Sequence, residues 1–95
     1  MNLTELHDQN KEISIAKLFQ GESGVVNTIH IQANGRINEH SSKVPALLLC
    51  IRGNTVYREQ SGRSISLNSG DYVDIPAGEI HWLEALEDSI LVLMK

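Results

Sequence analysis

The stretch GDYVDIPAGEIHW, residues 70–82, decides the fold, because each of its punctuating residues has a distinct backbone role. Gly70 permits the tight turn that starts a short strand, and Pro76 ends that strand, because proline cannot donate to a sheet ladder. Gly78 then provides the backbone freedom to reverse direction, so His81 stands at the start of the next strand. A histidine placed just past a rigid turn, at the mouth of a sheet, is typical of a binding site.

The same pattern of short runs separated by turns extends outward through most of the chain. Extended segments are predicted at residues 13–19, 25–32, 36–42, 45–52, 55–59, 64–67, 72–75, 80–85 and 89–94. Alternation of period two is clearest in 25–32, where Ile29 and Ile31 share one face while Thr28 and His30 share the other. No helical period is sustained after residue 10, so the pattern predicts an all-β barrel or sandwich and not a parallel α/β fold.

The length and composition indicate one mildly acidic domain. The 95 residues predict a single domain, 1–95, in which the polar residues 1–12 form an arm or a short helix. Eight basic against twelve acidic residues give a net charge of −4, which disfavours nucleic acid as a partner. No apolar run reaches the roughly 20 residues of a membrane span, and residues 1–5 lack the features of a signal peptide. We therefore expect a cytoplasmic location and no membrane partner.

The run at residues 46–51 is apolar on both faces of its predicted strand. Alternation divides its residues into two sets: Ala46, Leu48 and Cys50 on one face, and Leu47, Leu49 and Ile51 on the other. A sheet with one solvated face should carry polar residues in one of these sets. Both faces should therefore be covered, and we expect a second copy of the chain to cover the outer one. The sequence thus predicts a homodimer.

Residues 70–82 resemble the second conserved motif of the cupin superfamily, whose members are small antiparallel barrels with metals or small ligands at their mouths. Four residues match the motif at its spacing: Gly70, Pro76, Gly78 and His81. Ala85 stands where the family often has asparagine. The resemblance covers residues 25–93 and implies a cupin-like double-stranded β-helix, which is a small jelly-roll barrel.

The first family motif keeps most of its spacing but loses most of its ligands. Gly53 takes the place of the closing glycine, and Gly35 opens the motif with four intervening residues where the family has five. Between them, the family's two histidines and its glutamate correspond here to His40, Ser42 and Ala46.

Cupins that bind a metal generally use the two histidines and the glutamate of the first motif and the histidine of the second. Carried over position by position, the resemblance leaves only His40 and His81 as metal ligands, for a divalent transition metal such as Zn, Ni, Fe or Mn. A stable site usually takes three or more protein ligands. A third ligand could come from one of three residues: His30, Cys50 or, where the strand bulges, Glu39.

The predicted interior is an apolar pocket with one polar end. Its walls are expected to be Ala46, Leu48, Cys50, Leu83 and Ala85, with His40, Ser42 and His81 at the polar end. The predicted ligand-binding residues are therefore His40, Ser42, Leu48, Cys50, His81 and Leu83. Barrel mouths of this size hold one small ligand, so a small organic molecule is the expected partner.

Three functions from different classes fit these residues. The first is a small-molecule-binding or regulatory cupin barrel without a complete metal centre. The second is a metal-dependent enzyme of the dioxygenase or isomerase type, using His40, His81 and a non-standard third ligand. The third is a structural or interaction module. No residue is assigned a catalytic role, because the acidic residues are scattered, and the chain has no phosphate-binding loop and no nucleophile elbow.

Overall fold

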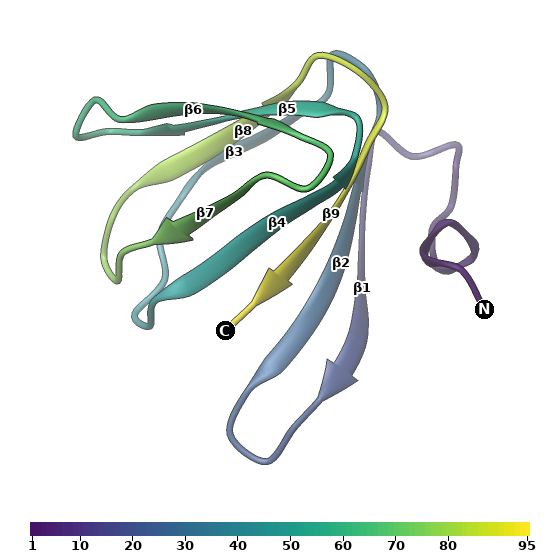
Figure 1. Cartoon of the computed structure of the whole chain (residues 1–95), viewed down its shortest axis with the longest axis horizontal. Helices are drawn as coiled ribbons and strands as arrows, with labels where there is room; N and C mark the ends of the chain where they lie inside the picture. The colour runs from purple at the N-terminus through teal and green to yellow at the C-terminus, as the bar shows by residue number, and fades with distance from the viewer.

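The computed structural model describes residues 1–95, which form one 3₁₀ turn and nine β-strands (Figure 1). The elements are η1 (Leu3–Leu6), β1 (Ile13–Gln20), β2 (Val25–Ile31), β3 (Arg36–His40), β4 (Ala46–Arg52), β5 (Asn54–Glu59), β6 (Ser64–Asn68), β7 (Tyr72–Ile75), β8 (His81–Ala85) and β9 (Ser89–Met94). Each predicted extended segment is a strand, and its bounds differ from the prediction by at most two residues. No helix in the structure has the length and apolar character needed to span a membrane.

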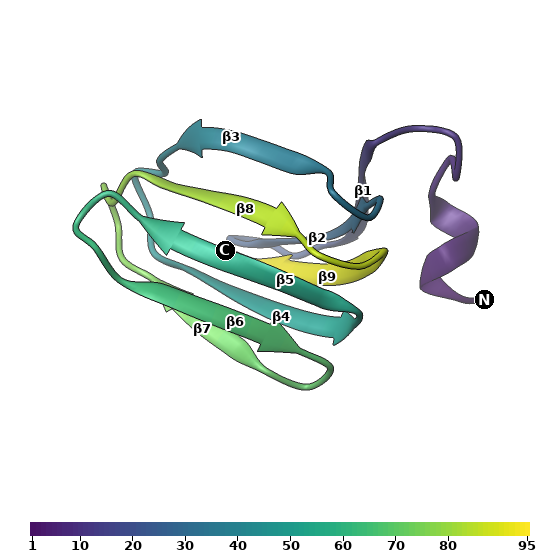
Figure 2. The ribbon, with the colours of Figure 1, turned by 90° about the horizontal axis from the view of Figure 1, so that it is seen from above.

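The strands form two antiparallel sheets that face each other (Figure 2). One sheet has the order β1-β2-β9-β4-β7 and the other has the order β3-β8-β5-β6. The chain passes repeatedly from one sheet to the other, as in a jelly roll. The predicted all-β fold, a double-stranded β-helix, is thereby confirmed. The β1–β2 hairpin extends past the edge of the four-stranded sheet (Figure 1). A cavity lined partly by this hairpin lies between the sheets, and we call the end of the barrel where it lies the open end, or mouth.

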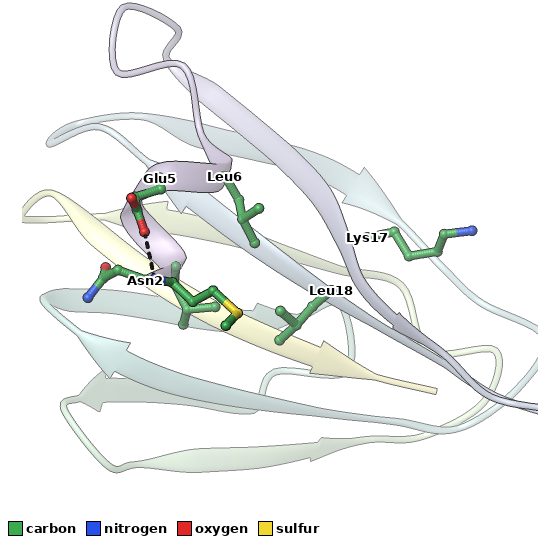
Figure 3. A pocket seen from close by; sticks show the side chains of 7 residues that line it. Asn2, Glu5, Leu6, Lys17 and Leu18 are labelled. Carbon is green, nitrogen blue, oxygen red and sulfur yellow. Dashed lines mark ion pairs between the residues drawn. The ribbon is translucent and has the colours of Figure 1, made fainter.

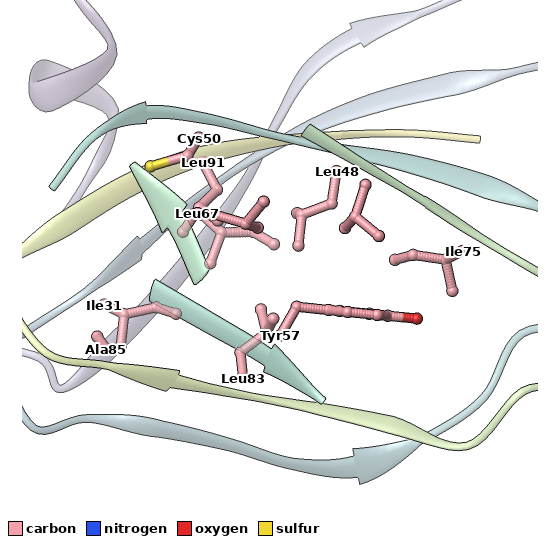
Figure 4. Close-up of a cluster of buried hydrophobic side chains, with 11 residues drawn as sticks. Ile31, Leu48, Cys50, Tyr57, Leu67, Ile75, Leu83, Ala85 and Leu91 are labelled. Carbon is pink, nitrogen blue, oxygen red and sulfur yellow. The ribbon is translucent and has the colours of Figure 1, made fainter. Parts of the chain in front are cut away.

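The core lies between the two sheets (Figure 4). Eleven buried hydrophobic residues form it: Ile29, Ile31, Leu48, Cys50, Tyr57, Leu67, Val73, Ile75, Leu83, Ala85 and Leu91. These residues follow the period-two alternation of their strands, so Leu48 and Cys50 point inward as predicted. Full burial of each large aliphatic side chain contributes roughly 1.5–3 kcal/mol, which makes this layer the main source of stability.

The opposite face of β4 is apolar but only partly covered. Leu47 and Leu49 are half-buried, and Ile51 is 39 % exposed. Tyr72, which pairs with Leu49 on the neighbouring strand β7, is 64 % exposed. No other part of the chain covers these side chains fully. That a second copy covers them stays a prediction, which sedimentation at micromolar concentration tests.

A buried histidine attaches the N-terminal arm to the outer face of the five-stranded sheet. His7 Nδ1 lies 2.8 Å from Ser14 Oγ, and His7 Nε2 lies 3.1 Å from Thr28 Oγ1. The Thr28 hydroxyl donates to the Leu91 carbonyl at 3.3 Å, so its oxygen accepts the proton on His7 Nε2. His7 Nδ1 then accepts from Ser14, which fixes the neutral tautomer of the ring.

His30 lies beside His7 and faces away from the barrel interior. The two ring centroids are 5.7 Å apart, and His30 is fully buried. His30 Nε2 donates to the Asp88 carboxylate at 2.8 Å, while His30 Nδ1 has no partner. Because His30 alternates with the core residues Ile29 and Ile31, it belongs to the outer face, where the arm covers it.

The turn roles predicted for the glycines of residues 70–82 are confirmed by the backbone. Gly70 has φ of 91° and Gly78 has φ of 79°, which is a left-handed conformation that side chains with a Cβ rarely adopt. Pro76 follows the last residue of β7, and the turn at Gly78 leads directly into β8. His81 therefore is the first residue of β8, at the open end of the barrel.

We expect Gly53→Ala to lower the free energy of unfolding by about 2 kcal/mol or more. Gly53 has φ of 97°, and an added Cβ would lie 2.5 Å from the Asp88 carbonyl oxygen and against Ser89 Oγ. Gly62→Ala is the matched control, because Gly62 also has a positive φ, of 113°, but nothing lies within 4 Å of an added Cβ. Urea unfolding should show a clearly smaller loss of the free energy of unfolding for Gly62→Ala. Equal losses in the two variants would contradict the close approach at Gly53.

Candidate functional site

The open end of the barrel brings together two histidines that are distant in sequence. His40 on β3 and His81 on β8 are cross-strand partners, and their ring centroids are 4.2 Å apart. The β3–β8 register shifts between Ile37 and His40, so both of these residues contact the interior although they are three apart. The predicted convergence of the two imidazoles at the mouth is confirmed.

Both rings are held by backbone carbonyls through the same nitrogen. His40 Nδ1 lies 2.8 Å from the Asn38 carbonyl oxygen, and His81 Nδ1 lies 2.9 Å from the Glu79 carbonyl oxygen. A carbonyl oxygen can only accept, so each Nδ1 carries the proton. In the neutral rings each Nε2 atom then has a free lone pair, and no protein group is hydrogen-bonded to it. These two atoms are available to a ligand.

The two histidines line a cavity of about 220 Å³ at the mouth. Its wall is mostly aliphatic: Ile15, Ile29, Ile37, Leu48, Ile75, Leu83 and Leu93. Besides the histidines, its polar lining residues are Asn27 and Lys95. Ile15 remains 59 % exposed because the β1–β2 hairpin overhangs the opposite sheet, so the cavity opens to solvent on that side. An apolar pocket with a few convergent polar groups is the usual form of a small-molecule site.

A hydrogen-bonded group around a buried carboxylate lies next to His81, on the core side of the site. The Tyr57 ring centroid is 5.6 Å from that of His81, and the Tyr57 hydroxyl donates to Glu59 Oε2 at 2.5 Å. Arg63 donates to the same carboxylate from Nη2 at 2.6 Å and from Nε at 3.0 Å. Ser61 Oγ adds a fourth donor at 3.3 Å. The buried carboxylate of Glu59 is therefore fully hydrogen-bonded.

This arrangement keeps Glu59 charged and Tyr57 neutral. The hydrogen bonds from Arg63 are the main reason that the pKa of Glu59 falls to about 2. Burial, followed by the neighbouring Glu59 carboxylate, raises the pKa of the Tyr57 hydroxyl well above its usual value. Sequence reasoning missed this group. Its signal was the spacing of Tyr57 and Glu59, two apart on one strand face, with Arg63 just past the following turn.

Burial also governs the protonation of His81. Burial lowers the pKa of His81 below the ordinary value of 6.5. The hydrogen bond to the Glu79 carbonyl opposes this effect and raises the pKa. The neighbouring His40 lowers this pKa further, whereas the charges of Glu59 and Glu79 raise it. The imidazole of His81 is therefore neutral at pH 7.

The structure places four of the six predicted ligand-binding residues around one cavity: His40, Leu48, His81 and Leu83. Ser42 lies outside it, in the segment after β3, where its carbonyl accepts from Gly78 N–H at 2.8 Å and its hydroxyl oxygen from Val44 N–H at 3.3 Å. Cys50 is buried in the core, and its thiol is 3.5 Å from the Arg52 carbonyl. Burial raises the pKa of the Cys50 thiol, so it packs as a small apolar group.

None of the three proposed third metal ligands reaches the histidine pair. His30 lies on the outer sheet face beneath the arm, and Cys50 points to the Arg52 carbonyl. The β3 strand does bulge, but Glu39 is exposed and binds the Arg36 guanidinium. The structure contains no group of three or more histidine, cysteine or acidic side chains placed to hold one ion. The donor set therefore does not fit a transition metal held by protein ligands alone.

A second, wider depression of about 560 Å³ lies between η1 and β1 (Figure 3). Its wall includes Leu3, Leu6 and Leu18, with the charged residues Glu5 and Lys17 at its edge. Glu5 is paired with the N-terminal ammonium at 3.4 Å. No histidine and no buried polar group converges there, so we assign the candidate site to the barrel mouth.

The protein should lose stability as the pH falls below about 6.5. Burial lowers the pKa values of His7 and His81 in the folded state, so the unfolded chain binds protons at a higher pH than the folded chain does. By linkage, this contribution to stability is complete above the unfolded value of about 6.5 and is lost as the pH falls through the folded values. Urea midpoints between pH 7.5 and 5 measure it. A His7→Gln, His81→Leu double variant should lose most of this dependence, and an unchanged slope would contradict it.

Comparison with known proteins identifies the fold. No protein-family model matches the chain, and no curated protein matches it in sequence. Similar solved structures include a cupin superfamily protein from Desulfitobacterium hafniense, with 15 % identity and a TM-score of 0.87, over 98 % of this chain and 84 % of that one. A conserved protein with a double-stranded β-helix domain from Klebsiella pneumoniae has 20 % identity and a TM-score of 0.84, over 99 % and 85 %.

A cupin-2 domain protein from Shewanella frigidimarina is also similar, with 15 % identity and a TM-score of 0.81, over 100 % of this chain and 92 % of that one. At these identities the likeness concerns the fold and not the activity. It agrees with the matched spacing of Gly70, Pro76, Gly78 and His81 and with the two facing sheets. The chain therefore has the cupin fold.

Proposed function

We propose that this chain is a small-molecule-binding or regulatory cupin barrel without a complete metal centre, and that its ligand occupies the mouth beside His40 and His81. One observation carries the proposal: an aliphatic cavity ends in two imidazoles whose Nε2 atoms have no protein partner. Polar atoms in an otherwise apolar pocket orient a ligand and give specificity. The mouth combines both properties.

The size of the cavity limits the ligand. Drug-sized sites measure roughly 300–1,000 Å³, and this cavity measures about 220 Å³. A compact metabolite fits such a volume, whereas a dinucleotide or a peptide does not. The aliphatic wall favours a molecule with an apolar body over a highly charged one.

Thermal melting with a panel of small metabolites tests the proposal. A ligand that binds only the folded state raises its stability by mass action, by about 2.7 kcal/mol at a concentration of one hundred times Kd. We expect at least one compact metabolite to raise the melting temperature of the wild type. His40→Ala and His81→Ala should abolish that shift.

Ser42→Ala is the matched control for these variants. Ser42 lies just after His40 in the chain but outside the cavity, so its truncation should leave the shift intact. Loss of the shift in Ser42→Ala and its retention in the histidine variants would place the ligand elsewhere. A structural module would show no shift with any metabolite.

A metal-dependent enzyme is the second candidate. It is favoured by the two Nδ1–H groups that donate to backbone carbonyls, because histidine ligands of metals are usually oriented in this way. The donor set opposes it, because only two of the four family positions hold ligands. If a metal were bound, His40 and His81 would hold it, and it would supply a Lewis acid at the mouth.

Elemental analysis of protein purified without a nickel column distinguishes these candidates. We expect well under half a metal ion per chain, since two imidazoles bind a transition metal weakly. A content of half an ion or more per chain, lost in the His40→Ala, His81→Ala double variant, would favour the enzyme instead.

A further inference from the structure

The histidine end of the mouth presents a ligand with two hydrogen-bond acceptors and no donor. The carbonyls of Asn38 and Glu79 take the Nδ1 protons of His40 and His81, so in the neutral rings each Nε2 carries a lone pair. Burial keeps His81 in that neutral form. This polarity follows from backbone contacts within β3 and just before β8, not from the ligand.

The buried carboxylate near this end, Glu59, and its partner Arg63 are already paired and do not reverse its polarity. Glu59 accepts from Tyr57, Ser61 and Arg63, and so neither the carboxylate nor the buried Tyr57 hydroxyl is left for a ligand. Arg63 also donates to the Asp74 carbonyl at 2.7 Å. No unpaired cation therefore stands behind the histidine pair.

We propose that the mouth selects a neutral molecule that carries a hydroxyl or N–H group on a compact apolar body, and that it discriminates against a carboxylate. The hydroxyl or N–H group of such a ligand donates to the Nε2 lone pairs of His40 and His81, while its apolar part packs against the aliphatic wall. At the histidine end a carboxylate oxygen would face two lone pairs and lose its hydration without gaining a donor, and the donors among the other lining residues, the Asn27 amide and the Lys95 ammonium, lie on β2 and after β9. This inference rests on the proposed function and specifies its ligand class.

Lys95 offers the competing arrangement. It lines the same cavity and is exposed, and its backbone pairs with Val25, the first residue of β2. A carboxylate ligand would have to orient toward this ammonium and leave the histidines without a partner. The two arrangements predict opposite orders of affinity for ligands that share one apolar body.

Three probes with the same ring separate the two arrangements: toluene, benzyl alcohol and benzoate. A dry cavity of about 150 Å³ is large enough for benzene, so a substituted ring fits this mouth. Titrations at pH 7.5, followed by the backbone amide signals of β3 and β8, give Kd for each probe. Benzyl alcohol should bind roughly fivefold more tightly than toluene, as one hydrogen bond contributes about 1 kcal/mol, and benzoate should bind more weakly than benzyl alcohol.

His40→Leu and His81→Leu should each weaken the binding of benzyl alcohol, and the double variant should bind benzyl alcohol no more tightly than toluene while toluene still binds. Retained toluene binding also reports that the barrel has folded, and the exposed position of His40 makes its variant the safer of the two. Ser42→Ala should leave all three affinities unchanged.

Two results would overturn the inference alone: a preference for benzyl alcohol that survives the double leucine variant, or benzoate binding more tightly than benzyl alcohol. In the second case, loss of the advantage in Lys95→Gln would assign the carboxylate to the Lys95 ammonium. If the wild type binds none of the three probes, the proposed apolar ligand site is wrong, and the inference falls with it.

Discussion

Burial of the two inner sheet faces against each other is the constraint on which the rest of the structure depends. Each strand has period two, so a slip of one residue would turn its core side chains to solvent and its polar ones inward. The core therefore fixes the register of every strand that contributes to it. That fixed register allows one irregularity, at β3, to place both Ile37 and His40 at the interior.

The polarity of the mouth follows from how its neighbours satisfy one another. A buried carboxylate such as Glu59 is tolerated only when donors surround it, and Tyr57, Ser61 and Arg63 do so here. Because those donors take up the carboxylate, it does not accept from His81, and each imidazole at the mouth donates from Nδ1 to a backbone carbonyl and leaves Nε2 without a protein partner. A rigid, paired group behind His81 also limits the movement of its ring, which suits a site that orients a small ligand.

Histidine serves two separate purposes in this chain, and the side of the sheet decides between them. His81 shares its strand face with the core residues Leu83 and Ala85, so it points inward, and as the first residue of β8 it lies at the mouth. His30 occupies the opposite face of β2, where the arm, His7 and Asp88 enclose it. The same residue type thus attaches an N-terminal arm on the outside of the five-stranded sheet and lines a cavity within the barrel.

Local chemistry in the sequence determined the strands, their turns and the inward set Leu48 and Cys50, because alternation, glycine and proline act within a few residues of themselves. The resemblance in motif spacing, in turn, predicted that His40 and His81 lie at one mouth. Tertiary structure alone decided that Ser42 and Cys50 lie outside the cavity, that the arm covers His30, and that the Tyr57 ring lies next to His81. Those outcomes depend on a bulge and on pairings between distant strands, which the alternation within a single strand does not specify.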